Sequence, residues 1–123
     1  FCVMGGIFSE GIDLTGERLI GVAVVGTGLP QVCTEREILK SFYQEAGKNG
    51  FDFAYRYPGM NKVLQAAGRV IRTAGDRGII LLLDERFLWG DQAALFPREW
   101  EDCVVTGREQ VRELLTDFWR RQG

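Results

Sequence analysis

The stretch LIGVAVVG, residues 19–26, is almost entirely apolar and rich in valine. A continuous run of this kind is typical of a strand that is buried on both faces of a parallel sheet. GIILLLD at 78–84 has the same character, and the shorter run FCVM at 1–4 ends at two glycines. We therefore predict strands at these three places.

Helical patterns occupy much of the remaining chain. Thr34 and Glu37 have the spacing of a capping box, which predicts a helix over 35–47. A second Thr-x-x-Glu box precedes an amphipathic segment that predicts a last helix at 107–121. Between them, FDFAYRYPG at 51–59 is expected to be an aromatic connection, and the segment after the third strand is expected to be irregular with a short helical turn. The side chains expected to be buried are Ile38, Leu39, Phe42 and Ala46 in the first helix, and Val111, Leu114, Leu115 and Phe118 in the last.

The composition fits one domain with a single core. The chain has 123 residues, of which 46% are hydrophobic and 26% are charged. Strands that alternate with helices predict an α/β domain in which helices cover both faces of a parallel sheet. Because the chain starts with Phe1, in what reads as a strand already under way, we expect it to be a piece of a larger protein.

Several functional classes are disfavoured by the composition. The chain has no histidine, which removes the usual general base near neutral pH and the commonest metal ligand. Its three cysteines lie far apart, which favours buried thiols in a reducing cytosol over disulfides or zinc. No apolar run approaches the ~18 residues of a membrane span, so we expect a cytoplasmic protein. A net charge of −2 disfavours nucleic-acid binding through overall positive charge but allows a locally basic face.

The stretch QAAGRVIRTAGDRG, residues 65–78, predicts a helix over 60–74 that presents two arginines. At ~100° per residue, Gln65, Arg69 and Arg72 fall on one narrow stripe, and the opposite side of the helix is apolar. A solvated helix face is the common explanation of such a stripe. A nucleotide or a facing domain is the alternative.

Gly68 lies within this predicted helix, which we expect to end at Gly75. A glycine in a helix interior costs ~1 kcal/mol relative to alanine. A large group that approaches the backbone closely would account for it, which favours the functional alternative.

The three predicted strands are followed by polar segments. These segments are SEGID at 9–13, GTGLPQ at 26–31 and DER at 84–86. In open parallel sheets, ligands bind outside the carboxyl ends of the strands, and we expect the arginine helix to pack beside this edge. Carboxylates, backbone N–H groups and guanidinium groups would then converge on a nucleotide phosphate or a phosphodiester backbone. The acidic residues of SEGID could equally decorate a turn, and GTGLPQ lacks the third glycine of a dinucleotide fingerprint.

Two of these stretches together resemble a known family. QAAGRVIR at 65–72 resembles motif VI (QxxGRxxR) of superfamily 2 helicases, and GIFSEGID at 6–13 resembles their motif V in the form found in XPD-like and DinG-like DNA helicases. The order and spacing of the stretches between and after them also fit, so the similarity covers roughly residues 3–90. The resemblance implies a three-layer RecA-like domain of the P-loop NTPase type, with a mostly parallel sheet and helices on both faces. Residues 1–123 would be part of the second, C-terminal motor domain.

The activity implied by this resemblance is that of an ATP-dependent DNA helicase that moves along single-stranded DNA, typically 5′→3′. Its partners would be the first RecA-like domain of the same chain and single-stranded DNA, with no membrane. ATP and Mg²⁺ would be bound mainly by that first domain, because this chain has no phosphate-binding loop of the G-x-x-x-x-G-K-[ST] type. The four cysteines that hold an iron–sulfur cluster in XPD-like members are absent here, so the presence of a cluster in the parent stays open. The isolated chain is expected to be inactive.

The resemblance also implies roles for single residues. Arg72 matches the arginine finger, Arg69 matches its partner in phosphate or interdomain contact, and Gln65 matches the residue that links the nucleotide site to domain closure. The remaining assignments are nucleotide binding or coupling for Glu10, Asp13 and Gly68, and DNA-phosphate binding for Ser9 and Gly11.

Two other functions stay open at this point. The first is an RNA helicase, or a translocase that moves without unwinding. The second is a non-enzymatic nucleic-acid-binding domain with degenerate motor motifs. The complete QxxGRxxR set counts against degeneration.

Overall fold

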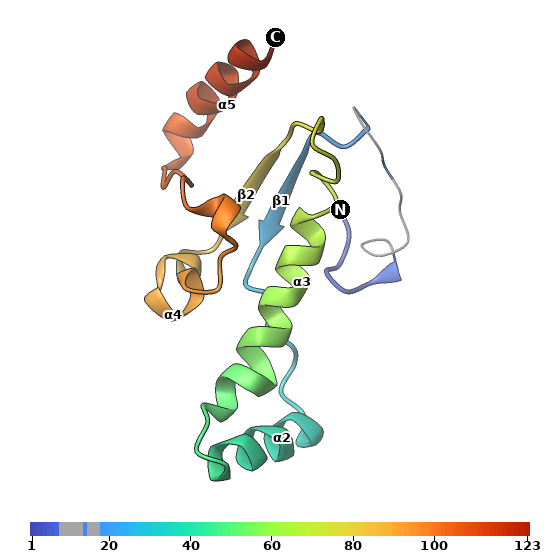
Figure 1. The fold of residues 1–123 in the computed structure, drawn as a ribbon, viewed down its shortest axis with the longest axis vertical. Helices are drawn as coiled ribbons and strands as arrows, with labels where there is room; N and C mark the ends of the chain where they lie inside the picture. Colours follow the sequence, from blue (N-terminus) through green and yellow to red (C-terminus); the bar gives the residue numbers. More distant parts are fainter. Residues whose placement is uncertain (8–13, 15–17) are drawn as a thin grey trace.

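The computed structural model describes residues 1–7, 14 and 18–123 (Figure 1). The two strands are β1 (Gly21–Val25) and β2 (Ile79–Leu83). The helical elements are α2 (Thr34–Glu45), the π-helix η2 (Asp52–Arg56), α3 (Tyr57–Ala67), the 3-10 helix η3 (Glu85–Leu88), α4 (Gly90–Ala93), the 3-10 helix η4 (Arg98–Trp100) and α5 (Arg108–Gln122).

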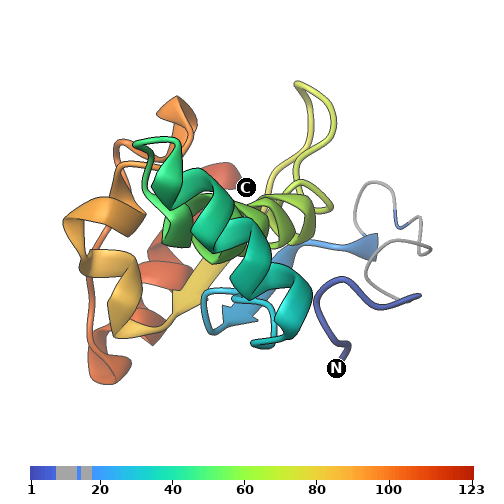
Figure 2. The ribbon, with the colours of Figure 1, turned by 90° about the horizontal axis from the view of Figure 1, so that it is seen from below.

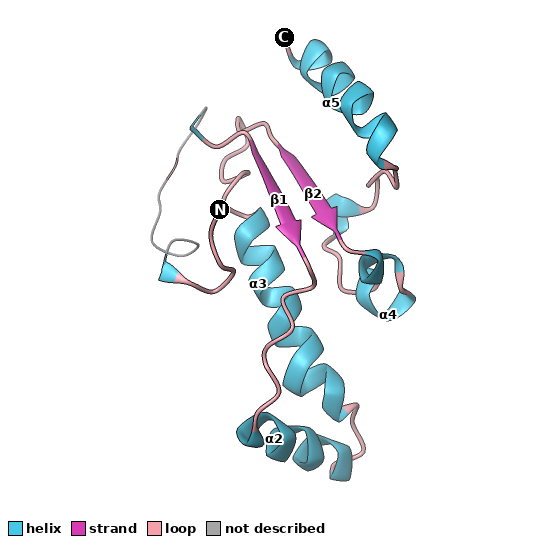
Figure 3. Cartoon of the chain, turned by 180° about the vertical axis from the view of Figure 1, so that it is seen from behind, coloured by secondary structure: helices cyan, strands magenta, loops and turns pink. Residues whose placement is uncertain are grey.

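β1 and β2 lie side by side and point in the same direction (Figure 3). The register runs from Gly21 opposite Ile79 to Val25 opposite Leu83. The predicted α/β class with a parallel sheet is confirmed, and in the described part of the chain this sheet has two strands.

The predicted strand at 1–4 is wrong. Residues 4–5 form a turn, in which the N–H of Gly6 donates to the carbonyl of Val3 at 2.9 Å. Gly5 has a φ of +77°, a left-handed conformation that glycine adopts easily and that ends an extended run. The glycines therefore place a turn where the apolar pattern predicts the end of a strand.

Burial of β1 alternates instead of covering both faces. Val24 is 2% exposed, whereas its neighbour Val25 is 72% exposed. Because successive side chains point to opposite faces of a sheet, one face of β1 is covered and the other is open in the described part of the chain. The apolar run thus predicts the position of the strand but overstates its burial.

The hydrophobic core lies between α3 and the covered face of the sheet. Val24 from β1, Met60 and Val63 from α3, and Phe87 from η3 form its buried centre. Burying a side chain of this size contributes roughly 1.5–3 kcal/mol. Around this centre pack the half-buried side chains of Met4, Val22, Leu64, Ala66, Leu82, Leu95, Phe96 and Trp100.

The helix predicted over 35–47 is confirmed as α2, but its capping box and its buried stripe are wrong. The residue before the helix is Cys33, and no side chain caps the first turn. The Glu37 carboxylate accepts a hydrogen bond from the Tyr55 hydroxyl instead. Ile38 and Phe42 are 64% and 63% exposed, because α2 packs on η2 and lies beyond the carboxyl ends of the strands (Figures 1 and 2).

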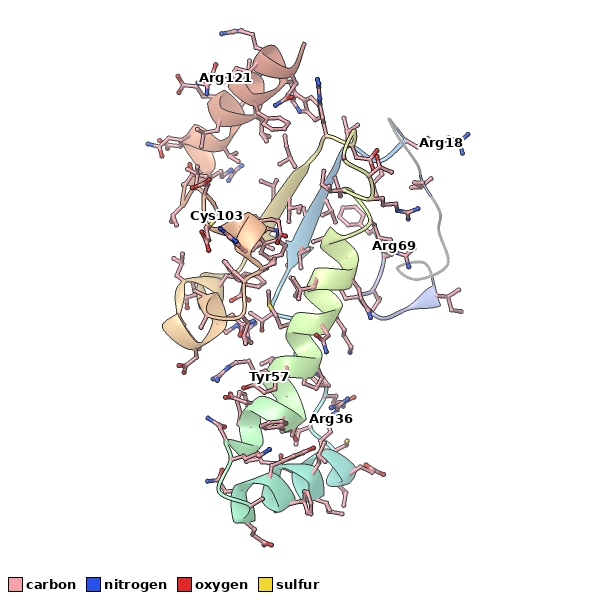
Figure 4. The ribbon with its side chains drawn as sticks, viewed as in Figure 1. Arg18, Arg36, Tyr57, Arg69, Cys103 and Arg121 are labelled. Atoms are coloured by element: carbon pink, nitrogen blue, oxygen red, sulfur yellow. The ribbon has the colours of Figure 1, made fainter. Side chains whose placement is uncertain are left out.

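The predicted connection at 51–59 is also wrong, because these residues are helical. The π-helical turn of η2 runs directly into α3, with the N–H of Tyr57 donating to the carbonyl of Asp52. Phe53 stacks on Tyr43 at 4.3 Å between ring centroids, and Arg36 donates to the carbonyl of Ala54 at 2.7 Å. These contacts join η2 to α2, near the side chains of Arg36 and Tyr57 labelled in Figure 4.

The helical elements predicted for the C-terminal part of the chain are present, but the cap and the burial predicted for the last helix are not. Short helical turns occupy the segment from η3 to η4, as expected, and α5 confirms the last helix. The capping box of Thr106 and Glu109 is wrong, because Gly107 precedes α5 and no side chain caps its first turn. None of the residues of α5 is buried, so its apolar stripe is only partly covered.

The structure also tests the expectations about the cysteines and about membrane spans. The prediction of buried thiols is wrong, because all three cysteines are exposed. Among the described residues, no helix combines the length and the apolar character that crossing a bilayer requires.

Candidate functional site

The two arginines of the QAAGRVIR stretch lie after α3 and not on it. α3 ends at Ala67, and Gly68 is its C-cap residue, with φ −64° and ψ −9°. Arg69 then donates to the carbonyl of Ala66 at 3.3 Å in a tighter turn, and the chain leaves the helix. The helix predicted over 60–74 therefore starts earlier and ends seven residues earlier than expected, and the single stripe through Gln65, Arg69 and Arg72 is wrong.

Gly68 has a different explanation from the one that the sequence suggested. It lies at the end of α3, so the penalty for a glycine in a helix interior does not apply. Its N–H donates to the carbonyl of Leu64 at 2.8 Å, and a Cβ atom on Gly68 would lie 3.2 Å from that same oxygen. The residue is exposed.

Residues 69–77 form a loop, called the arginine loop below. Its two stems pack against each other where Val70 meets Gly78. Val70 is 4% exposed and anchors the outgoing stem. A Cβ atom on Gly78 would lie 2.1 Å from Cγ1 of Val70 and 3.0 Å from the carbonyl oxygen of Ile20. Only a glycine therefore allows the returning stem to pass between these groups. The N–H of Ile79 then donates to Ile20 at 3.0 Å, where pairing with β1 begins.

The carboxylate of Asp76 organises the interior of the arginine loop. Its Oδ2 accepts the N–H of Arg72 at 2.9 Å and the N–H of Thr73 at 2.8 Å. The hydrogen bond from the Arg72 N–H is the largest cause of the lowered pKa of Asp76, followed by the bond from Thr73. Arg72 is exposed and Arg69 is half-buried beside the end of α3 (Figure 4).

The arginine loop lies where the strands begin, and the carboxyl ends of the strands lie at the opposite end of the sheet. A Cβ atom on Gly59, in the first turn of α3, would lie 2.9 Å from the carbonyl oxygen of Thr27, just after β1. Val70, three residues after α3 ends, packs instead against Gly78, which lies beside Ile20 just before β1. GTGLPQ and DER follow the carboxyl ends of β1 and β2 as expected, and SEGID lies outside the described residues, but the expected position of the two arginines beside this edge is wrong. A helix that connects two parallel strands must run back along them, so its end reaches the edge where the strands begin.

At the carboxyl edge, the side chains of Asp84 and Arg86 form an ion pair with two hydrogen bonds. The guanidinium of Arg86 donates through Nε to Oδ1 at 2.8 Å and through Nη2 to Oδ2 at 2.7 Å. Arg86 thereby lowers the pKa of Asp84 to about 2. Oδ1 also accepts the N–H of Arg86 at 2.9 Å, which caps η3. This pair therefore stabilises the segment that follows β2.

The GTGLPQ segment makes a tight turn at the same edge. Gly26 and Gly28 have φ values of +86° and +68°, which favour glycine. Between them, Thr27 is 2% exposed, and its buried hydroxyl has no hydrogen-bond partner among the described residues.

The remaining predicted site residues divide into two groups. Gln65 is exposed on α3, two residues before the helix ends. Ser9, Glu10, Gly11 and Asp13 lie outside the described residues. Sequence reasoning missed Asp76, although the turn-forming composition of TAGD at 73–76 is a signal for a carboxylate that binds nearby backbone N–H groups.

Metal binding can be assessed for the described part of the chain. There, no group of three or more histidine, cysteine, aspartate or glutamate side chains comes together in a way that could hold a metal ion.

Known proteins resemble this chain over most of its length. The family model described as "Helicase C-terminal domain" matches residues 1–103. The chain is 33% identical to the regulator of telomere elongation helicase 1 homolog of Oryza sativa subsp. japonica, in an alignment that covers 98% of this chain and 13% of that protein. It is 30% identical to the general transcription and DNA repair factor IIH helicase subunit XPD of Schizosaccharomyces pombe, over 94% of this chain and 15% of that protein.

A third relative has a similar degree of identity. The chain is 36% identical to the ATP-dependent DNA helicase chl-1 of Caenorhabditis elegans, over 71% of this chain and 11% of that protein. The chain thus spans between 11% and 15% of the length of these three relatives. With a matching family model, an α/β fold and relatives that are XPD-like helicases, the chain belongs to the helicase C-terminal domain family of the XPD-like and DinG-like superfamily 2 helicases.

Proposed function

We propose that this chain is part of the second motor domain of an ATP-dependent DNA helicase that moves 5′→3′ along single-stranded DNA. The observation that carries the proposal is the exposed Arg72 on a loop whose backbone is fixed at both stems and within. The relatives, which are named as helicases, support a helicase parent.

In this proposal, Arg72 acts as an arginine finger. Its guanidinium reaches the γ-phosphate of an ATP molecule that the first RecA-like domain holds with Mg²⁺. The ion neutralises charge on the phosphate oxygens when bound. Phosphoryl transfer develops further charge on these oxygens, and a finger arginine contributes ~10³–10⁵ in rate in GTPases. Arginine suits the role because it is always charged and presents a planar fork of donors.

The other motif residues link this chemistry to movement. Arg69, half-buried at the base of the arginine loop, would contact phosphate or the facing domain, and Gln65 would connect the nucleotide site to closure. Because the finger and the phosphate-binding loop lie on different domains, hydrolysis waits until the domains close. The residues proposed for the nucleotide are Glu10, Asp13 and Gly68, and those proposed for the DNA backbone are Ser9 and Gly11.

The experiment that tests the finger compares two arginines of one loop in a full-length protein that carries this domain. Arg72→Ala should remove most DNA-stimulated ATP hydrolysis while ATP still binds. Arg77→Ala is the matched control, because Arg77 lies five residues further on and donates to the carbonyl of Gln122 at 2.6 Å. The control should keep its turnover. Near-normal hydrolysis by the Arg72→Ala protein would refute the finger assignment.

The alternatives are separated by substrate. Strand displacement on a DNA duplex with a 5′ single-stranded tail supports the helicase, and stimulation by RNA alone supports an RNA helicase. ATP-dependent movement without displacement supports a translocase. Binding of nucleic acid without any hydrolysis supports the degenerate binding domain.

A further inference from the structure

The side chain of Asp76 ties together the part of the arginine loop that carries Arg72. A single oxygen, Oδ2, accepts the N–H groups of Arg72 and Thr73. The N–H of Asp76 donates back to the carbonyl of Thr73 at 3.1 Å. These three bonds close a small turn around the carboxylate, and Arg72 is its first residue.

The surroundings of this turn make it a defined platform. Val70, two residues before Arg72, is buried, and Gly78, two residues after Asp76, is packed against it. The stems are therefore held by apolar contact and by the start of β2. Between the stems, the described hydrogen bonds to the backbone of Arg72 and Thr73 come from Asp76. The direction in which the Arg72 side chain leaves the loop depends on this backbone.

We propose that Asp76 is a positioning residue for the arginine finger: its carboxylate fixes the backbone of Arg72, from which the guanidinium reaches the triphosphate. This inference rests on the proposed function of Arg72. It adds that part of the finger's efficiency resides in a residue that never touches the nucleotide. Misplacement of a catalytic group by about 1 Å can cost ~10²-fold in rate.

The charge of Asp76 supports this role. The two backbone hydrogen bonds lower the pKa of the carboxyl, and the positive charge of Arg72 lowers it further. Asp76 is thus ionised at neutral pH, and hydrogen bonds to an ionised acceptor are stronger than neutral ones. The negative charge lies at the backbone of the finger, where it binds N–H groups.

The test uses a full-length protein that carries this domain, with three variants at carboxylate positions. Asp76→Ala removes both backbone bonds and should lower kcat for DNA-stimulated hydrolysis by ~10- to 100-fold, with KM for ATP within about twofold of the unmodified protein. Asp76→Asn retains a carbonyl oxygen that can take the place of Oδ2, so it should recover a large part of that loss. Asp102→Asn, at an exposed carboxylate elsewhere in the chain, is the control and should leave kcat unchanged.

A double-mutant cycle separates positioning from an independent effect. If Asp76 acts through Arg72, adding Asp76→Ala to Arg72→Ala should cause no further loss in single-turnover hydrolysis. Additive losses would overturn the inference, and so would normal turnover by Asp76→Ala while Arg72→Ala is inactive. Normal turnover by Arg72→Ala itself would refute the finger assignment instead. Melting curves of each variant show whether it is folded. If Asp76→Ala is unfolded at the assay temperature, hydrolysis is measured below its melting midpoint, and normal turnover there would overturn the inference.

Discussion

Gly28 and Gly59 approach each other so closely that a Cβ atom on Gly28 would lie 2.6 Å from the carbonyl oxygen of Gly59. Gly28 also has a φ of +68°. The loop after β1 and the first turn of α3 thus fit together only without side chains. This contact fixes where α3 starts and, eleven residues of helix later, where the arginine loop starts.

Gly28→Ala should destabilise the chain by about 1–3 kcal/mol, because the methyl group meets backbone and the left-handed conformation adds strain. The free energy of unfolding in urea measures the effect. Gly47→Ala is the control, since Gly47 has a φ of +77° but nothing within 4 Å of its Cβ position. An equal loss in the two variants would mean that the contact with Gly59 contributes nothing.

Gly78→Ala should destabilise the base of the arginine loop by about 1–3 kcal/mol, because its methyl group overlaps Cγ1 of Val70. Combining it with Val70→Ala should cost less than the sum of the two single changes, since the second change makes room for the first. Urea denaturation of the two single variants and the double variant tests this. Strict additivity would contradict the packing described.

Acid should weaken the carboxyl edge of the sheet through Asp84. Arg86 lowers the pKa of Asp84 from 3.8 to about 2 in the folded chain, so the folded state favours the ionised form. This stability is fully present above about pH 4 and is lost as the pH falls towards 2. The pKa difference corresponds to about 2 kcal/mol, and solvent screening of the partly exposed Arg86 reduces this to about 1 kcal/mol. Asp84→Asn should flatten the stability profile over this interval, as followed by urea denaturation at several pH values.

Tyr55→Phe should loosen α2 from η2. The buried Tyr55 hydroxyl donates to Glu37, and this bond raises the pKa of Tyr55 to about 12 and lowers that of Glu37. Its loss should cost about 1–2 kcal/mol. Amide hydrogen exchange in α2 should become faster, whereas Tyr57→Phe, at an exposed ring, should leave it unchanged. Unchanged exchange in the first variant would show that the hydrogen bond between Tyr55 and Glu37 contributes nothing to holding α2.

The 123-residue chain should bind single-stranded DNA weakly and with strong salt dependence. It presents only part of a phosphate track on a chain of net charge −2, so binding should depend on a few local contacts with phosphates. Fluorescence titration of a labelled oligonucleotide at several salt concentrations measures the slope. Tight binding that salt does not affect would contradict this expectation.

The sequence predicts the strands at 19–26 and 78–84 well because both are continuous apolar runs. It predicts the helices but not their burial, since α2 and α5 have apolar stripes that no element of the described part covers fully. The capping box at the start of α2 does not form because the carboxylate of Glu37 is bonded to Tyr55, eighteen residues away, and local spacing does not reveal such a tertiary partner.

Motif spacing identifies the residues of the candidate site, but the expectation that its arginines lie on a helix is wrong. QxxGRxxR located Gln65, Gly68, Arg69 and Arg72 in the sequence, but periodicity cannot show that the helix stops at Gly68. Once the helix is shorter, the arginines belong to a loop, and the residue that organises this loop is Asp76. Such a contact depends on the backbone of the turn, which no helical pattern contains.

The contact between Val70 and Gly78 should make the length of the arginine loop independent of how the sheet and core pack. Because the sheet begins immediately beyond that junction, we expect insertions or deletions between the two residues to leave strand pairing and core packing intact. A change of loop length alone should therefore move the side chain at position 72 relative to the sheet while the core of the domain stays the same.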